Sequence, residues 1–433
     1  MRIYDIILKK RNGGALTKDE IAFFIDGCVD GTVPDYQAAA LCMAIYFRGM
    51  TDEETVALTD CMARSGDTID LSRFGELTVD KHSTGGVGDK TTLIVAPIVA
   101  ALGGKVAKMS GRGLGYTGGT ADKLESIPGM RVTMGREEFL RQVEETGIAV
   151  IFQSGNLTPA DKKLYALRDV TATVDSIPLI TSSVMSKKIA AGARSIVLDV
   201  KAGSGAFMKT PEDARILARN MVAIGKACGR NMAALITDMS RPLGTAVGNT
   251  LEVIEAAEVL RGASRGDLYD VCAALATEMT MLFAGISHDE AAARVADAIE
   301  SGAAYAKMKE WIAAQGGDIA WLERAKYGDG AAAAVPVVCP ADGFITAMDT
   351  EAIGAASVVL GAGRSKKEDA IDFSAGIIVK RKTGDRVEKG QTLACLYTND
   401  AAAIEPAAKR YLDALTIGPE PPKKTELIFD IIR

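Results

Sequence analysis

The stretch that decides the fold reads Lys81-His82-Ser83-Thr84-Gly85-Gly86-Val87-Gly88-Asp89-Lys90-Thr91-Thr92. It holds one of the two histidines of the chain and a cluster of glycines. Residues 77–80 before it have strand character, and residues 91–102 after it form an apolar run of helical length. A glycine loop between a strand and a helix directs backbone N–H groups and a helix N-terminus at one point. The stretch therefore predicts an anion-binding loop.

Side chains of the loop support this prediction but do not fit a Walker A motif. Lys81 would add a positive charge, and Ser83 and Thr92 would add two hydroxyl donors. A Walker A loop needs Gly-Lys-Ser/Thr without interruption, whereas Asp89 separates Gly88 from Lys90 and places a carboxylate where phosphate oxygens would lie. A nucleoside-triphosphate loop of that type is therefore not expected.

A second glycine-rich loop covers residues 110–120, SGRGLGYTGGT, and follows a predicted strand at 105–109. It contains a literal G-x-G-x-x-G at Gly113, Gly115 and Gly118. In a dinucleotide-binding fold an acidic residue is expected about twenty positions later, to bind the ribose. That position falls near Thr133, where the sequence has no Asp or Glu. The motif alone is weak support for a dinucleotide site.

Length and charge narrow the class of protein. A chain of 433 residues is long enough for about two to four domains with a large buried core. The net charge is −6, with 50 basic and 56 acidic residues interspersed, so the sequence lacks the basic footprint of a nucleic-acid binder. We expect no nucleic-acid partner.

The cysteines and the N-terminus suggest a compartment. The seven cysteines are scattered and form no CxxC pair, which argues against a disulfide framework or a structural zinc site. The first residues lack the pattern of a secretory signal, and no apolar run reaches about eighteen uninterrupted residues. We expect a cytoplasmic protein without a membrane partner.

Patterning along the chain predicts an α/β protein with a helical N-terminal domain, a larger α/β domain with a mixed or largely parallel sheet, and a C-terminal α+β domain. Capping boxes at Thr17–Glu20 and Thr51–Glu54 and a proline at 34 mark the helices of the first domain. Residues 158–191 contain two helical stretches without a strand, and we expect them to join that domain. The predicted domains are residues 1–66 with 158–191, residues 67–157 with 192–330, and residues 331–433.

A further group of polar residues follows the glycine loops. Ser183 and Lys187 are spaced i, i+4 and would share one face of a helix, and Arg168 precedes them in LYALRD. Each of these residues alone could be a solvated surface side chain. Together with an anion loop and a neighbouring histidine, they suit a reaction in which phosphate attacks one atom while negative charge builds on a departing group.

At this point the sequence resembles a known family. The motifs KHSTGGVGD, SGRGLGxTGGTxDKLE, PADKKLYALRDVT, SIPLI and DVKxGSGAFM are similar, in order and spacing, to those of the pyrimidine-nucleoside phosphorylase and thymidine phosphorylase family. The resemblance spans essentially the whole chain. It implies a homodimer formed through the helical domain, with an active site in the cleft between the helical and α/β domains.

The resemblance also implies roles for individual residues. The implied phosphate ligands are Lys81, Ser83, Thr92, Lys108, Met109, Ser110 and Thr120. The implied base-binding residues are Arg168, Ser183 and Lys187, with Leu114, Val174, Ile180 and Phe207 as the apolar wall, and the catalytic residues are His82, Arg168 and Lys187. The implied reaction is the reversible phosphorolysis of uridine, thymidine or deoxyuridine to the free base and an α-(deoxy)ribose 1-phosphate, without a redox cofactor or a divalent metal.

Three positions depart from the family pattern. Tyr116 replaces a usual His, Phe152 replaces a usual Gly, and Lys90 replaces a Thr or similar residue. The resemblance implies a site for a monovalent cation, such as potassium, at Gly88, residue 90, Leu243, Ala246 and Glu255. Lys90 could replace this ion by a salt bridge to Glu255, could point outward and leave the ion in place, or could be an ordinary solvated lysine.

Two other functions remain open at the level of sequence. An anthranilate phosphoribosyltransferase-like enzyme shares a glycine-rich loop, but its chemistry needs Mg²⁺ ligands, and no convincing Asp-Glu pair lies beside the loop. A non-catalytic nucleoside- or phosphate-binding protein would need the site to be kept without turnover. The sequence decides neither which pyrimidine nucleoside is preferred nor the physiological direction of the reaction.

Overall fold

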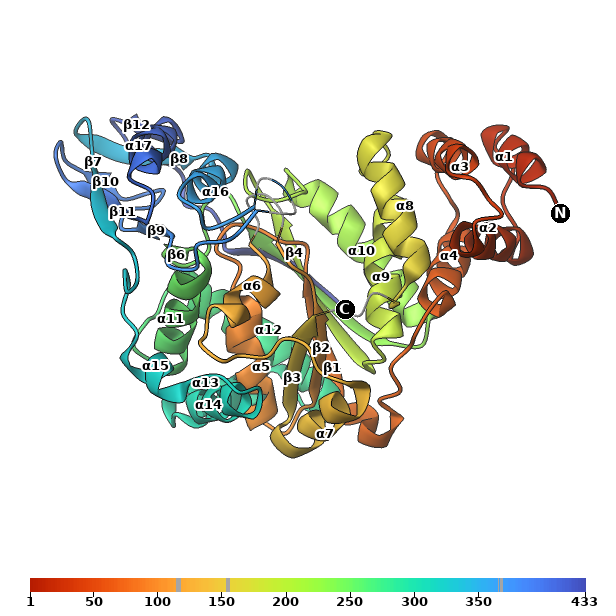
Figure 1. Ribbon diagram of the computed structural model, residues 1–433, viewed down its shortest axis with the longest axis horizontal. Helices are drawn as coiled ribbons and strands as arrows, with labels where there is room; N and C mark the ends of the chain where they lie inside the picture. Colours follow the sequence, from red (N-terminus) through yellow and green to blue (C-terminus); the bar gives the residue numbers. More distant parts are fainter. Residues whose placement is uncertain (114–117, 153–155, 365, 367–368) are drawn as a thin grey trace.

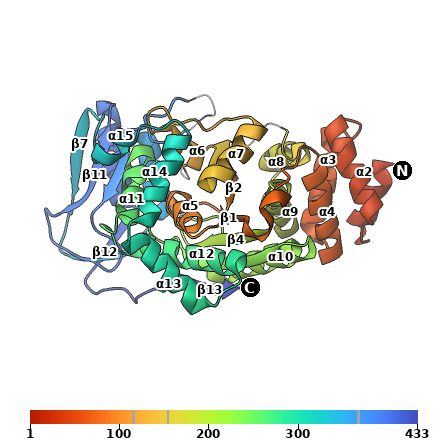
Figure 2. The same ribbon diagram turned by 90° about the horizontal axis from the view of Figure 1, so that it is seen from below.

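The computed structural model describes residues 1–113, 118–152, 156–364, 366 and 369–433. Its elements form three groups along the long axis: a helical domain at the N-terminal end, a central α/β domain and a C-terminal domain at the opposite end (Figure 1). The view from below shows the same order (Figure 2). This arrangement confirms the predicted fold class.

The helical domain is built from the first four helices and from two helices later in the chain. These are α1 (Ile3–Arg11), α2 (Lys18–Asp30), α3 (Asp35–Arg48), α4 (Asp52–Arg64), α8 (Pro159–Val170) and α9 (Ile177–Ala190). Both predicted capping boxes form, because Thr17 and Thr51 each accept a hydrogen bond from the backbone of the glutamate three residues later. Leu164 and Leu179 share one hydrophobic core with residues of α1 to α4, so residues 158–191 pack with this domain.

The central sheet joins strands expected in the α/β domain with one strand from the C-terminus. The parallel strands are β1 (Val79–Ser83), β4 (Ser195–Ala202) and β5 (Asn231–Asp238), and β13 (Ile428–Ile432) pairs antiparallel with β5. The parallel pair β2 (Val106–Ser110) and β3 (Ile148–Phe152) continues the sheet, since Val79 N donates to Lys105 O at 3.1 Å. The largely parallel sheet is as expected, but its outer strand comes from the last residues, which the sequence placed with the C-terminal domain.

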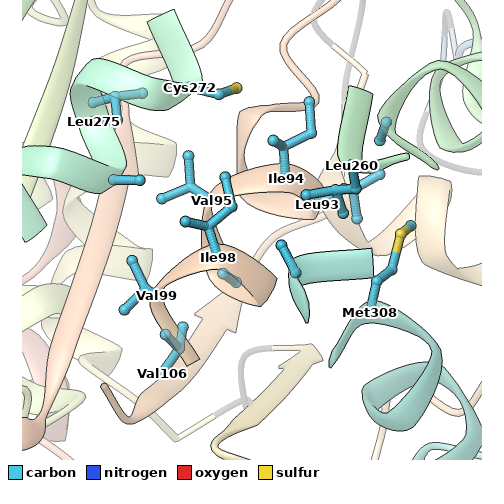
Figure 3. Close-up of a cluster of buried hydrophobic side chains, with 14 of the residues drawn as sticks. Leu93, Ile94, Val95, Ile98, Val99, Val106, Leu260, Cys272, Leu275 and Met308 are labelled. Carbon is cyan, nitrogen blue, oxygen red and sulfur yellow. The ribbon is translucent and has the colours of Figure 1, made fainter. Parts of the chain in front are cut away.

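Helix α5 (Thr91–Ala101) is the centre of the main core. Its residues are almost all apolar, which is typical of a helix buried on every side. Leu93, Ile94 and Val95 lie among side chains of neighbouring helices, including Leu260 and Leu275 (Figure 3). The surrounding helices include α11 (Asn249–Leu260), α12 (Asp267–Ala284), α13 (His288–Glu300) and α14 (Ala303–Ala314). This packing fixes the start of α5, and with it the predicted anion loop.

The α/β domain is completed by five further helices among the described residues. These are η1 (Ser72–Leu77), α6 (Thr120–Glu125), α7 (Arg136–Thr146), α10 (Pro211–Ala227) and α15 (Ile319–Arg324). Thr210 caps α10 by accepting a hydrogen bond from Asp213 N. In Figure 1, α10 lies between the sheet and the helical domain.

The C-terminal domain holds two small antiparallel sheets and two helices. One sheet has the order β6-β9-β11-β7 and the other β10-β8-β12. The bounds are β6 (Ala246–Val247), β7 (Ala333–Val338), β8 (Gly343–Met348), α16 (Thr350–Val359), β9 (Gly376–Val379), β10 (Arg386–Val387), β11 (Thr392–Thr398), η2 (Ala401–Ala403), α17 (Ile404–Asp413) and β12 (Leu415–Gly418). Because β6 belongs to the segment before α11, this sheet is tied to the central domain.

Among the described residues, no single helix is both long and apolar enough to cross a membrane. Helices α12 and α13 pass the test of length and composition only as a pair, and they meet at a bend of 118°. Leu275 and Val295 of this pair belong to the main core.

Candidate active site

The ends of β1 and β2 and the start of α5 enclose a cavity of about 330 Å³. Because β1 and β2 run in the same direction, their carboxyl ends open at one edge of the sheet, where ligands of α/β folds bind. The predicted site residues that line the cavity are Lys81, His82, Ser83, Thr92, Lys108, Met109, Ser110, Thr120 and Lys187. The structure thus places the whole predicted phosphate set around one space.

Glycines let both loops approach this space. Gly85 and Gly88 have φ angles of 91° and 75°, which residues other than glycine rarely adopt. Gly113 and Gly119 face each other so closely that a Cβ on either would collide with the backbone of the other. The glycines of the second loop thus serve a close approach of two backbone segments above the cavity.

Asp80 organises the lysines on the wall of the cavity. Its carboxylate accepts hydrogen bonds from Lys108 Nζ at 3.2 Å, from Lys188 Nζ at 2.9 Å and from Lys81 N at 2.8 Å. Burial alone would raise the pKa of Asp80, but the charges of Lys108 and Lys188 lower it to about 2. The carboxylate therefore stays ionised.

Lys108 is the lysine most affected by this crowding. Burial lowers its pKa, and the charges of Lys188 and Lys81 lower it further, while Asp80 raises it, so that the pKa is about 8. A buried cation beside other cations is favoured to bind an anion, because the anion relieves their mutual repulsion. The cavity has the electrostatic character of a phosphate site.

Lys81 is held in place by acidic and hydroxyl groups behind the cavity. Its ammonium donates a hydrogen bond to Thr91 Oγ1, and it lies 3.7 Å from Asp89 and 3.6 Å from Asp199. Asp199 is also ion-paired with Lys201 at 2.7 Å. These contacts fix the direction of Lys81 before any ligand arrives.

His82 lies at the end of β1 and lines the cavity. Burial lowers the pKa of His82 well below its usual value, and the charges of Lys188 and Lys108 lower it further. The imidazole is therefore neutral at pH 7. It can donate a hydrogen bond but does not carry a spare proton, so of the two roles considered from the sequence, the hydrogen-bond donor fits this environment.

Arg168, at the end of α8, is turned into its own domain. Its guanidinium donates to Thr173 O at 3.2 Å, to Leu179 O at 3.1 Å and to Val174 O at 2.6 Å. Since a guanidinium has five N–H groups, these contacts leave donors for a ligand. Arg168 does not line the cavity.

Ser183 and Lys187 lie together on α9, as their spacing predicted. Lys187 Nζ is 3.3 Å from Ser183 Oγ and forms an ion pair with Asp161 of α8. Ser183 is buried and, like Arg168, does not line the cavity, whereas Lys187 does. Lys187 therefore connects the phosphate cavity to the predicted base-binding residues.

The predicted apolar wall lies apart from the cavity. Val174 and Ile180 are partly buried in the helical domain, and Phe207 is 45% exposed on the α/β side. Leu114 and Tyr116 lie outside the described residues. Of the unusual residues, Phe152 ends β3 with the guanidinium of Arg112 5.4 Å from its ring centre.

Sequence reasoning missed the charged residues that hold the predicted phosphate-binding lysines in place. Asp80, Lys188 and Asp89 line or support the cavity, and Asp199 and Lys201 form a buried ion pair behind it. The one local signal that could have found such a residue is Asp199, a charged residue inside the largely apolar strand β4, because an unpaired charge there would be costly.

A larger open hollow of about 1720 Å³ lies elsewhere, between α4 and the segment that begins at residue 68. Arg64, Arg194 and Arg230 line it, but none of the predicted site residues does. Since it has neither glycine loop, we assign the chemistry to the smaller cavity.

The predicted cation site is filled by a side chain. Lys90 is fully buried, and its ammonium lies among Leu243 O, Ala246 O and Glu255. The interpretation of Lys90 as a solvated lysine, or as one that points outward, is wrong. Among the described residues, no group of three or more His, Cys, Asp or Glu side chains could hold a metal ion.

Comparison with known proteins agrees with this architecture. Residues 4–66 match the helical bundle domain of the glycosyl transferase family, and residues 75–305 match its a/b domain. Residues 344–418 match the pyrimidine nucleoside phosphorylase C-terminal domain. The fold is also similar to anthranilate phosphoribosyltransferase from Thermus thermophilus, with a TM-score of 0.59 and 21% identity over 71% of this chain and 98% of that one.

Full-length relatives are much more similar in sequence. The pyrimidine-nucleoside phosphorylases of Bacillus subtilis and Geobacillus stearothermophilus are 52% and 51% identical to this chain over the whole length of both partners. That of a Staphylococcus epidermidis strain is 54% identical over 92% of each chain. This chain therefore belongs to the pyrimidine-nucleoside phosphorylase family.

Proposed function

We propose that this enzyme catalyses the reversible phosphorolysis of pyrimidine nucleosides, giving the free base and α-(deoxy)ribose 1-phosphate. The observation that carries the proposal is the position of Lys187. It lines the cavity that holds the phosphate residues and lies 3.3 Å from Ser183 of the base-binding group. Phosphate on one side of Lys187 and the nucleoside on the other would meet at the bond between sugar and base that is cleaved.

The anion cavity would hold inorganic phosphate. Lys81 and Lys108 supply positive charge, and Ser83, Ser110, Thr92 and Thr120 supply hydroxyl donors at its wall. A phosphate held there is oriented to attack C1′ from the face opposite the base. Fixing the nucleophile in this way lowers the barrier because the entropy of positioning is lost on binding rather than in the transition state.

The helical domain would hold the base. As the bond from C1′ to N1 breaks, positive charge develops on the sugar and negative charge on the leaving base. Arg168 and Lys187 stabilise that negative charge, and neutral His82 donates a hydrogen bond to the base O2. The reaction as written needs neither a redox cofactor nor a divalent metal.

In the structure, the two sets of residues are not yet around one space, because Arg168, Ser183 and Phe207 do not line the cavity. A nucleoside that bridges the domains would draw them together. Closure of this kind excludes water, and it would favour transfer to phosphate over hydrolysis.

We also propose a homodimer formed through the helical domain. Tyr4, Tyr36 and Phe47 of α1 and α3 are 61%, 74% and 75% exposed, and aromatic side chains are enriched at subunit contacts. The proposed compartment is the cytoplasm, since all seven cysteines carry free thiols, as in reducing surroundings.

The test is an assay of uridine, thymidine and deoxyuridine with and without phosphate, scoring both free base and sugar 1-phosphate. We expect both products only when phosphate is present, arsenate as an effective substitute, and no reaction with purine nucleosides. Base released equally fast without phosphate would show a hydrolase. Nucleoside binding without release of base would show a binding protein, and either result would refute the proposal.

A further inference from the structure

Lys90 is the N-terminal cap residue of α5, and its side chain is completely buried. The ammonium donates to Leu243 O at 2.9 Å, to Ala246 O at 2.9 Å and to Glu255 Oε2 at 2.5 Å. An ammonium has three N–H donors, and all three find an acceptor here. All hydrogen-bond donors of the Lys90 ammonium are thus satisfied within the protein.

The acceptors are themselves arranged around Glu255. Its Oε1 accepts hydrogen bonds from Thr245 N at 2.6 Å and from Thr245 Oγ1 at 2.8 Å, and its Oε2 accepts one from Ala246 N at 2.9 Å. Gly88 lies against the same carbonyl groups, since a Cβ there would be 2.5 Å from Leu243 O. Gly88, Leu243, Ala246 and Glu255 therefore converge, and the Lys90 ammonium is at the point of convergence.

A monovalent cation does not fit this set of residues. The ammonium already contacts both carbonyl oxygens and the carboxylate, so a second cation would lie next to it and repel it strongly in a buried site. The neighbouring acids offer no spare negative charge. Glu252 pairs with Lys123 at 2.8 Å, and Asp267 pairs with Lys382 at 2.6 Å.

The charge state of the pair supports this arrangement. Burial lowers the pKa of Lys90, but the charges of Glu255 and Glu252 and the hydrogen bond to Glu255 together raise it by more, so the net pKa lies above the usual value for lysine. Burial likewise raises the pKa of Glu255. The charge and hydrogen bond of Lys90, together with the backbone hydrogen bonds from Thr245 and Ala246, outweigh that effect, so this pKa lies below its usual value. Both groups are ionised at pH 7.

We propose that the Lys90 ammonium replaces a bound monovalent cation as a built-in tether, so that the stability and activity of this protein do not depend on potassium. The tether joins the anion loop to the segment 243–246 and, through Glu255, to α11. Asp89 and Thr91 on either side of Lys90 contact Lys81 of the phosphate cavity. Lys90 is therefore a positioning residue for the phosphate loop.

The test compares the wild type with Lys90→Thr and Lys90→Met in potassium, sodium and tetramethylammonium chloride at equal ionic strength. Thermal midpoint, kcat, and KM for phosphate are measured in each. Threonine restores an oxygen ligand and leaves room for an ion, whereas methionine fills the space without a charge or an oxygen. Lys10→Thr is the matched control, since it also breaks a buried lysine-carboxylate pair, with Glu54 at 2.7 Å in the helical domain, but leaves the Lys90 site intact.

We expect the thermal midpoint, kcat, and KM for phosphate of the wild type to be the same in all three salts. Lys90→Thr should have a lower thermal midpoint and about tenfold lower kcat/KM for phosphate in tetramethylammonium, and potassium should restore much of both. Lys90→Met should be impaired in all three salts, and Lys10→Thr should not respond to potassium. Recovery by potassium distinguishes replacement of an ion from simple loss of a buried salt bridge.

A wild type whose thermal midpoint or activity falls in tetramethylammonium would overturn the proposal, and this comparison holds even if both Lys90 variants fail to fold. A Lys90→Thr variant that folds but ignores potassium would also overturn it. The kinetic part rests on the proposed phosphorolysis, but the thermal midpoint does not. If the protein does not catalyse phosphorolysis, the thermal midpoints still show whether Lys90 replaces the ion.

Discussion

The carboxylate of Asp80, in strand β1, accepts a hydrogen bond from the ammonium of Lys188, in helix α9, at 2.9 Å. One residue belongs to the sheet that bears the phosphate loop, and the other follows Lys187 in the helical domain. Both side chains are buried. The two halves of the proposed active site are thus joined by a charged hydrogen bond at the wall of the cavity.

Replacing Asp80 by asparagine should loosen this junction and leave Lys108 and Lys188 without their counter-charge. Because the pKa of Asp80 is about 2 in the folded protein and about 3.9 in an unfolded chain, ionised Asp80 contributes on the order of 2 kcal/mol of stability at pH 7. That contribution is present above about pH 4 and is lost as the pH falls towards 2. We expect Asp80→Asn to lower the thermal midpoint at pH 7, with a difference from wild type that shrinks on acidification. A difference that is constant from pH 7 to pH 3 would contradict the assignment.

Lys108 should set the upper limit of pH for phosphate use. With a pKa of about 8, it is charged below that pH and neutral above it, so kcat/KM for phosphate should fall as the pH rises through about 8. Lys108→Arg keeps the charge at all working pH values and should remove this inflection. Lys105→Arg, on a residue whose ammonium binds Glu144 O outside the cavity, is the control and should keep it. An inflection that persists unchanged in Lys108→Arg would assign it to another group.

The helices, the strands and the anion loop could be predicted from the local sequence. Strands such as Ile148–Phe152 follow from short apolar runs, the starts of α2 and α4 follow from capping boxes, and the anion loop follows from glycines between a strand and a helix. In each case the residues that determine the structure lie within a few positions of one another. The predicted phosphate-binding residues could be identified for the same reason, because most of them lie in or next to the two glycine loops.

The parts that could not be predicted depend on distant partners. Asp80 is bonded to lysines 28 and 108 residues away, and no local pattern specifies either contact. The strand Ile428–Ile432 is apolar enough to pair in either domain, and its edge position beside β5 is fixed by tertiary packing. For Lys90 the sequence left three alternatives open, one of them a salt bridge to Glu255, and only the convergence of Leu243, Ala246 and Glu255 decides among them.

His82 should act by hydrogen bonding rather than by proton transfer. Since its pKa lies well below the usual value, kcat/KM for the nucleoside at saturating phosphate should show no inflection near pH 6.5. His82→Gln, which keeps an N–H donor, should retain more activity than His82→Ala, while His288→Ala, at the exposed second histidine, should be neutral. Tyr116→His should keep the reaction and alter at most the substrate preference. A larger loss in Tyr116→His than in His82→Ala would reverse the assignment of the donor.

Arg168 should be needed for the base but not for phosphate. Arg168→Ala and Lys187→Ala should each lower kcat/KM for the nucleoside by a factor of about 10² to 10³, the usual cost of one lost stabilising donor. Arg168→Lys should not restore activity, because a single ammonium cannot reach Thr173 O, Val174 O and Leu179 O and still offer donors to a ligand.

The measurement is initial-rate kinetics with each substrate varied in turn, together with KM for phosphate. Lys163→Ala, on the same helix as Arg168 and paired with Asp35 at 3.2 Å, is the matched control and should be near wild type. If Arg168→Ala raises KM for phosphate as much as KM for the nucleoside, the guanidinium supports the whole cleft rather than the base. Wild-type kinetics in both alanine variants would show that the base binds elsewhere, because each variant removes a cation that is proposed to stabilise the leaving group.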